Sequence, residues 1–182
     1  MALEFDGTSQ YVDCGNNASL NITEGTWMSW IKIPASSTHE SVVHKYTINA
    51  SLNVWGYWVQ LLNTGVIEGG VGNNTASWGY YKKGSVALDD DSIHHIAASF
   101  SNSDGLRIYQ DGTEVSGTLG GGSKPSTIGT SGNPLYISAQ YGISSFSYGK
   151  GQKWDVRVYN RVLSANEIAE IYHHRGADKV WQ

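Results

Sequence analysis

The sequence predicts an all-β fold, an antiparallel sandwich or barrel that ends in one short helix. Three observations predict it: apolar and polar residues alternate with period two in segment after segment, turn residues separate these segments, and charged residues make up only 15 % of the 182 positions. An average chain carries about 25 % charge, and helices supply much of it because Glu, Lys and Arg are good helix formers. Gly, Ser, Asn and Thr, which favour turns, fill 67 of the 182 positions.

The first long strand is expected at residues 25–33, where alternate residues point to opposite faces. Trp27 and Ile31 fall on one face and Trp30 on the other, and we expect Trp27 to lie in the core. Pro34 ends the strand because proline lacks the amide hydrogen of the ladder. Further strands are predicted at 41–48, 54–62, 93–100, 105–110 and 153–160.

The strongest hairpin signal is Asp111-Gly112, which joins the run at 106–110 to Thr113-Glu-Val115. The segment 117–134 is rich in Gly, Ser and Thr and is expected to be a long loop within the strand pattern. We therefore expect one domain over residues 1–182.

One helix is predicted after the last strand. Ser164 followed by Glu167 is typical of a capping box, and Ile168 and Ile171 have helical spacing. Gly176 is expected to provide the cap at the end of this helix.

Charge and hydropathy exclude two classes of partner. The net charge of −4 and the lack of a basic run argue against nucleic acid, because phosphates require clustered Lys and Arg. No stretch of about 18 apolar residues and no N-terminal targeting segment is present, so we expect no membrane insertion, and the localisation stays open. The single cysteine, Cys14, cannot form an internal disulfide, and we expect a buried thiol.

Three blocks carry a family resemblance. The first is Leu3-Glu-Phe-Asp-Gly-Thr-Ser-Gln-Tyr-Val12, which leads to the strand at 26–32. The second is His94-His-Ile-Ala97 with 106–112, and the third is the segment 155–168, Asp-Val-Arg-Val-Tyr-Asn-Arg-Val-Leu-Ser-Ala-Asn-Glu-Ile. Together they resemble the laminin-G-like, concanavalin A-like jelly-roll family. The resemblance implies an antiparallel two-sheet jelly-roll sandwich whose first and last strands lie side by side.

The resemblance also implies a structural calcium ion, with Asp6 and Asp155 as candidate ligands from the first and last strands. Calcium takes six to eight oxygen ligands, and carboxylates are common among them. The alternative is that Asp6 stabilises its own turn before Gly7 and that Asp155 pairs with an arginine.

The same fold hosts glycosidases and lyases, so catalysis needs its own test. Sandwich glycosidases of this superfamily carry a pattern that resembles Glu-x-Asp-x-(x)-Glu, because hydrolysis needs paired carboxyl groups. Glu4 and Asp6 offer the first two positions, but Thr8 and Ser9 stand at the third. No block resembles the lyases. We therefore predict that the chain is not an enzyme.

Aromatic residues beside short polar residues carry the functional signal, because sugar rings lie on aromatic faces while amides bind their hydroxyls. In the strand at 54–62, Tyr57 and Val59 form the expected core face, which leaves Trp58 and Gln60 on the outer face. The other candidate sugar-binding residues are Trp78, Tyr80, Tyr81 and Tyr141.

The leading prediction is a non-catalytic, lectin-like domain that binds a poly- or oligosaccharide. A structural or adhesive protein, such as a virion or cell-surface component that forms a homo-oligomer, is the alternative from another class. A glycosidase or polysaccharide lyase is the third. The sugar itself stays open.

Overall fold

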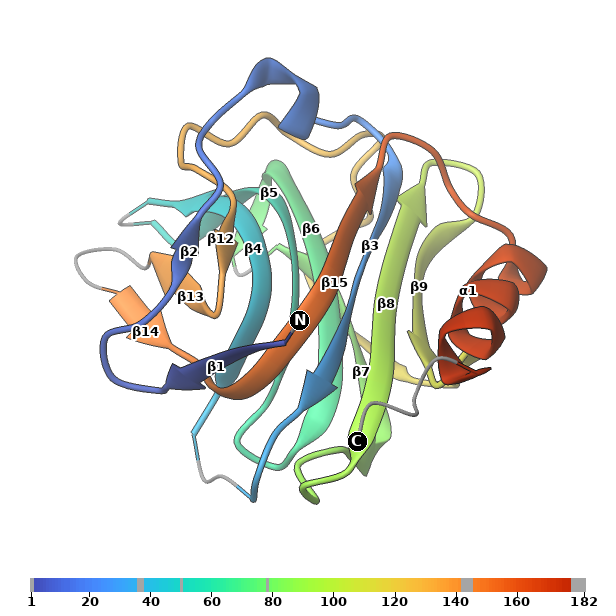
Figure 1. Ribbon diagram of the computed structural model, residues 1–182. Coiled ribbons are helices and arrows are strands. Elements are labelled where there is room, and N and C mark those ends of the chain that lie inside the picture. The colour runs from blue at the N-terminus through green and yellow to red at the C-terminus, as the bar shows by residue number, and fades with distance from the viewer. Residues whose placement is uncertain (1, 36–37, 50, 78, 142–145, 178–182) are drawn as a thin grey trace.

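Two antiparallel sheets lie face to face in the computed structural model (Figure 1). The structure describes residues 2–35, 38–49, 51–77, 79–141 and 146–177. The six-stranded sheet has the order β1 (Leu3–Asp6), β15 (Lys150–Tyr159), β3 (Gly25–Lys32), β8 (Ile93–Ser101), β9 (Gly105–Gln110) and β10 (Thr113–Glu114). The seven-stranded sheet has the order β11 (Thr118–Gly121), β7 (Tyr80–Ala87), β6 (Val66–Ser77), β5 (Asn53–Leu61), β4 (Glu40–Ile48), β12 (Tyr136–Ile137) and β2 (Val12–Asp13).

This arrangement confirms the predicted jelly-roll sandwich. The first and last strands, β1 and β15, pair directly, with Leu3 opposite Lys153 (Figure 1). A separate hairpin of β13 (Ala139–Tyr141) and β14 (Phe146–Tyr148) lies beside β4, and one 3-10 turn, η1, covers Ala18–Leu20. The predicted hairpin turn is confirmed, since Asp111 and Gly112 both have positive φ, as a type I′ turn requires.

Two long strands, β6 and β7, were not predicted, because Gly and Asn are depleted in strands and fill much of β6. These glycines make room for neighbouring groups. A Cβ at Gly69 would lie 2.8 Å from the Cβ of Ala98 in the other sheet. The short strand β11 likewise lies within the segment 117–134 that the sequence analysis assigned to a loop.

The core fills the space between the sheets with side chains that alternate along the strands. Trp27 is fully buried there, as predicted. On β5, Tyr57 and Val59 face the core, so the neighbouring side chains of Trp58 and Gln60 face outward, also as predicted.

The α-helix α1 (Ala165–Ala177) covers the outer face of the six-stranded sheet (Figure 1). Its predicted capping box is confirmed: the Glu167 amide donates to Ser164 Oγ (3.2 Å), and the Ser164 amide donates to Glu167 Oε2 (2.8 Å). Gly176 lies within the helix, so it does not provide the expected cap. The ring of Tyr172 stacks on Trp30 of β3, with ring centroids 5.5 Å apart.

Two further expectations concern single features. Cys14 is exposed, contrary to the expected buried thiol, because it lies in the connection that follows β2. Across the described residues, no helix has the length and apolar character needed to cross a membrane.

Candidate functional site

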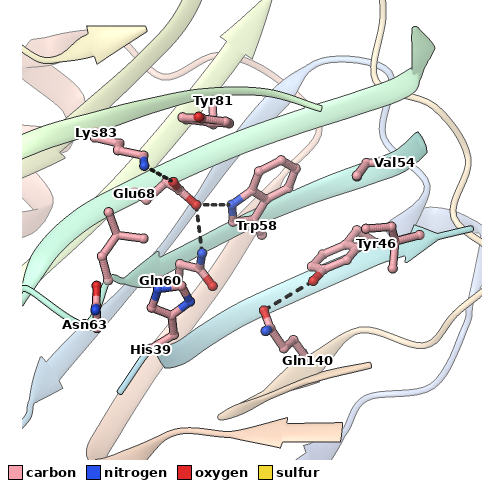
Figure 2. Close-up of a pocket in the computed structure, with 12 residues that line it drawn as sticks. His39, Tyr46, Val54, Trp58, Gln60, Asn63, Glu68, Tyr81, Lys83 and Gln140 are labelled. Atoms are coloured by element: carbon pink, nitrogen blue, oxygen red, sulfur yellow. Dashed lines mark hydrogen bonds and ion pairs between the residues drawn. The ribbon is translucent and has the colours of Figure 1, made fainter. Parts of the chain in front are cut away.

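The outer face of the seven-stranded sheet contains a pocket with a volume of about 380 Å³ (Figure 2). Four adjacent strands, the turn after β5 and the β13–β14 hairpin contribute its walls. The lining residues are His39, Tyr46, Ile48, Val54, Trp58, Gln60, Leu62, Asn63, Glu68, Tyr81, Lys83 and Gln140.

Strand register assembles the polar floor of this pocket. Gln60 of β5 lies opposite Glu68 of β6, and Glu68 lies opposite Lys83 of β7. Residues in register on neighbouring strands point to the same face, so the three side chains form one row across the sheet. They lie on three consecutive strands, and the pairing of β6 with both neighbours brings them together.

Glu68 is the centre of this row. Its Oε1 accepts hydrogen bonds from Gln60 Nε2 at 2.7 Å and from Trp58 Nε1 at 3.3 Å (Figure 2). Its Oε2 lies 3.7 Å from the ammonium of Lys83, and Glu68 as a whole is only 7 % exposed. The carboxylate is therefore held in one orientation at the pocket floor by groups from the two neighbouring strands, β5 and β7.

Only one of the two polar atoms of the Gln60 side-chain amide has a hydrogen-bond partner among the described residues. Its Nε2 donates to Glu68, while its buried Oε1 has no hydrogen-bond partner among the described residues. A buried acceptor without a partner costs about 1–3 kcal/mol. The pocket wall thus contains a buried acceptor with no hydrogen-bond partner among the described residues.

Two aromatic rings lie flat on the sheet because each covers a glycine of the next strand. Trp58, Gly70, Tyr81 and Gly120 are in register across β5, β6, β7 and β11. A Cβ at Gly70 would lie 2.0 Å from Cζ2 of Trp58, and one at Gly120 would lie 2.4 Å from Cε2 of Tyr81. The two rings start two strand spacings apart, about 9.6 Å.

The accessible area of these rings differs. Trp58 is only 5 % exposed, because the ring of Tyr46 also packs against it at a centroid distance of 5.5 Å. Tyr81 is half-buried, and the ammonium of Lys83 lies 4.9 Å from its centroid. The Trp58 ring therefore forms part of the pocket floor, whereas the more exposed Tyr81 ring forms one side of the pocket.

The wall opposite Tyr81 is fixed by buried aromatic groups of β4. Burial, and then the negative charge of Glu68, raise the pKa of Tyr46 to about 12, so its hydroxyl keeps its proton and donates to Gln140 Oε1 at 3.2 Å. Behind Tyr46, burial lowers the pKa of His44 to about 3, which keeps that ring neutral. The position of Gln140 on the hairpin is thereby tied to β4.

The structure brings together three of the predicted sugar-binding residues: Trp58, Gln60 and Tyr81. The prediction for Tyr80 needs correction, since Tyr80 packs against the core between the sheets, as its alternation with Tyr81 requires. Trp78 lies outside the described residues, and so does the side chain of Tyr141, whose backbone belongs to β13.

Several lining residues were not predicted from the sequence, above all Glu68 and Lys83. Both lie on the two strands that were not recognised. Had residues 66–87 been assigned to a hairpin, Glu68 and Lys83 would have been placed on the same face as Tyr81. Lys83 lies two residues from Tyr81, and Glu68 lies two residues from Gly70, which pairs with Tyr81. The missing signal was therefore the glycine-rich strand β6.

The two predicted metal ligands lie apart. Asp6 is opposite Lys150 of β15, and Asp155 follows five residues later, about 16 Å along a strand. Three main-chain amides donate to the Asp6 carboxylate and hold its pKa well below its usual range, and the Asp155 carboxylate accepts from Arg157 Nε at 3.0 Å.

Both contacts match the alternative roles given above. Asp6 and Asp155 do not fit as joint ligands of one calcium ion. Over the part of the chain that the structure describes, no group of three or more His, Cys, Asp and Glu side chains could hold a metal.

Comparison with known proteins agrees with this architecture. Residues 6–169 match the profile of a family described as the concanavalin A-like lectin/glucanases superfamily. None of the curated proteins matches the chain.

Among solved structures, the chain is similar to the CBM40 domain of a Ruminococcus gnavus IT-sialidase bound to α2,3-sialyllactose, with a TM-score of 0.73, 13 % identity, and coverage of 94 % of this chain and 98 % of that one. It is also similar to a SAP-like pentraxin from Limulus polyphemus, with a TM-score of 0.63, 16 % identity, and coverage of 94 % and 81 %. At these identities the likeness concerns the fold.

Proposed function

Because the chain belongs to the concanavalin A-like lectin/glucanase superfamily, we propose that it is a non-catalytic carbohydrate-binding domain with its sugar site in the pocket of Figure 2. The observation that carries this proposal is the buried carboxylate of Glu68, which Gln60 and Trp58 hold in one orientation at the pocket floor. A fixed acceptor of this kind suits a ligand rich in hydroxyl groups.

The pocket has the groups that sugar recognition needs. Glu68 is an acceptor for hydroxyl protons, and hydrogen bonds to a charged group contribute about 1.5–3 kcal/mol each. Lys83 and the Nε2 of Gln140 are donors, and Tyr81 offers an aromatic surface for the C–H face of a sugar ring. The volume of about 380 Å³ lies within the usual range for small-ligand pockets.

The charges favour an uncharged sugar. The lining residues that the structure describes include one carboxylate, one lysine and no arginine, and the lysine already lies 3.7 Å from the carboxylate. An acidic sugar would bring a second negative charge to a floor where Glu68 is only 7 % exposed, and screening by water is weak there. The Ruminococcus domain binds sialyllactose, so this chain would share its class of ligand but differ in the charge of the sugar.

The same lining argues for binding without catalysis. Glycoside hydrolysis uses two carboxyl groups, about 5–9.5 Å apart. Among the described residues that line the pocket, Glu68 is the one carboxylate, and it is bonded to its neighbours. The homo-oligomer expected for the structural alternative stays a prediction.

A glycan array with neutral and sialylated oligosaccharides tests the proposal. We expect binding among the neutral glycans and a fall in affinity of at least tenfold for Glu68→Gln, which keeps the shape but removes the charge. Glu114→Gln, an exposed carboxylate on β10 of the other sheet, is the matched control and should bind like the wild type.

Three results would contradict the proposal. The folded protein could bind no glycan, the two glutamine variants could bind equally well, or sialylated glycans could bind as tightly as neutral ones. The last result would overturn the assignment to uncharged sugars alone.

A further inference from the structure

A second hollow, with a volume of about 420 Å³, adjoins the pocket on the side of the β13–β14 hairpin. The two share three lining residues: His39, Asn63 and Gln140. The second hollow adds Ser147 and Tyr148 of β14, and its described lining carries no Asp, Glu, Lys or Arg. The two hollows therefore form one groove that crosses the sheet and ends at the hairpin.

We propose that the second hollow is a second sugar subsite and that the ligand is an uncharged oligosaccharide of at least two units. This inference rests on the proposed function, because it assigns the first unit to the pocket that contains Glu68. It adds a binding site at the hairpin and a minimum length for the ligand.

The length of the groove supports this assignment. The first pocket alone extends from Tyr81 on β7 to Tyr46 on β4. That distance is three strand spacings, about 14 Å, which exceeds the width of one pyranose ring. The second hollow continues beyond β4 to Tyr148, so one sugar unit fills only part of the groove.

The wall between the two hollows is held in place. Gln140 Oε1 accepts from the Tyr46 hydroxyl at 3.2 Å, as Figure 2 shows. At the base of the hairpin, Ser138 Oγ donates to the main-chain oxygen of Gly149 at 2.7 Å, and the Gly149 amide donates to the main-chain oxygen of Ser138 at 2.8 Å. Ligand binding would therefore meet a preformed wall rather than order one.

The groups at the junction remain available to a ligand. The Nε2 of Gln140 and the side chains of His39 and Asn63 make no hydrogen bond to any other described residue. These amide and imidazole groups suit the hydroxyl groups next to a glycosidic bond.

The far end of the groove has an aromatic surface. The half-buried ring of Tyr148 packs against that of Tyr11, at a centroid distance of 6.0 Å. A tyrosine ring of this kind offers a flat apolar face to a second sugar ring. The second hollow thus repeats the combination of ring and small polar groups found in the first.

Calorimetric titration with cello-, manno- and galacto-oligosaccharides of one to four units tests the inference. In the series that binds, we expect two units to bind at least tenfold more tightly than one. Tyr148→Ala should remove this gain and leave the affinity for one unit within twofold of the wild type. Tyr148→Phe, which keeps the ring, should retain the gain.

Ser147→Trp provides a second variant that does not depend on removing a packed ring, because Ser147 is exposed and an indole there would fill the hollow. It should also abolish the gain from the second unit. Ile93→Ala, at an exposed residue of the other sheet, is the control, and melting temperatures verify that each variant is folded.

Equal affinity for one and two units, or an undiminished gain in both Tyr148→Ala and Ser147→Trp, would overturn the second subsite and leave the first pocket intact. Loss of binding to one unit in both variants would also overturn it, since the hairpin would then act on the first pocket only. Failure of every series at every length would instead overturn the proposed function.

Discussion

The indole Nε1 of Trp27 donates a hydrogen bond of 2.8 Å to the main-chain oxygen of Trp58, across the core between the two sheets. The side chain of Trp58 points the other way, to the floor of the groove. The Trp27 ring also packs against Tyr57, at a centroid distance of 4.9 Å. The core therefore positions the backbone from which the floor of the groove is built.

Replacing Trp27 by Phe should destabilise the fold. The change removes the donor and leaves the main-chain oxygen of Trp58 without this bond in a fully buried position, which costs about 1–3 kcal/mol in the free energy of unfolding, in addition to the lost ring volume. Urea denaturation measures the effect. Met28→Leu is a volume-conserving control in the same strand, and an equal loss in both variants would contradict the role of the hydrogen bond.

Replacing Gly70 by Ala should disturb the groove without removing any of its polar groups. The added Cβ would lie 2.0 Å from the Trp58 ring, so the indole must lift from the sheet or the strands must shift. We expect glycan affinity to fall at least tenfold and the free energy of unfolding to fall by about 1–3 kcal/mol. The array glycans and urea denaturation measure the two effects.

Gly132→Ala is the matched control for this change. The nearest atom to its added Cβ, Thr47 Oγ1, lies 3.9 Å away, so affinity and stability should stay close to those of the wild type. Wild-type affinity in Gly70→Ala would show that the position of the indole does not matter for binding.

His94 should make stability depend on pH. Its hydrogen bond to Asp111, at 2.8 Å, is the main cause that raises its pKa above the usual 6.5, with a further contribution from Asp90. Protonated His94 therefore stabilises the fold fully below about pH 6.5, and this contribution is lost as pH rises through the higher pKa of the folded state. Thermal unfolding from pH 5 to 8 should show the loss in the wild type and not in His94→Gln. Parallel profiles for the two proteins would contradict this assignment.

Lys153 should have the opposite effect at higher pH. Burial lowers its pKa from 10.5 to about 7. Between these values the unfolded chain binds a proton that the folded protein does not, so the free energy of unfolding should rise with pH across this window. Urea titrations at pH 7, 8.5 and 10 should show a steeper rise in the wild type than in Lys153→Met. Lys124→Met, at an exposed lysine, should keep the wild-type slope.

The capping box of α1 should contribute measurably to stability. Ser164→Ala removes the oxygen that accepts from the Glu167 amide, and the loss of such a cap costs about 0.5–2 kcal/mol. Asn166→Ala, at an exposed position two residues further into the helix, should cost nothing. A Ser164→Ala variant as stable as Asn166→Ala would contradict the contribution of the cap.

Local periodicity was sufficient to predict most of the fold and part of the groove. Alternation along β5 separates Tyr57 and Val59 from Trp58 and Gln60, and it predicted both faces without knowledge of the neighbouring strands. The same rule, applied to β7, would have separated Tyr80 from Tyr81.

Glu68 could not be found in this way. Its strand is rich in glycine, which lowers β-propensity, and its role comes from register with Gln60 and Lys83 on two other strands. Contacts with other strands require these glycines, since Gly69 faces the opposite sheet and Gly70 faces the Trp58 ring. Local sequence determines the alternation, whereas the site depends on how separate strands pair.

The alternation of ring and glycine across Trp58, Gly70, Tyr81 and Gly120 has a consequence for evolution and engineering. Each ring keeps its tilt because the residue beneath it, Gly70 or Gly120, has no side chain. A single methyl group at Gly120 would tilt Tyr81 and leave every hydrogen-bonding group of the floor in place. Substitutions at these glycines can therefore change the ligand preference, while the polar residues that bind hydroxyl groups stay unchanged.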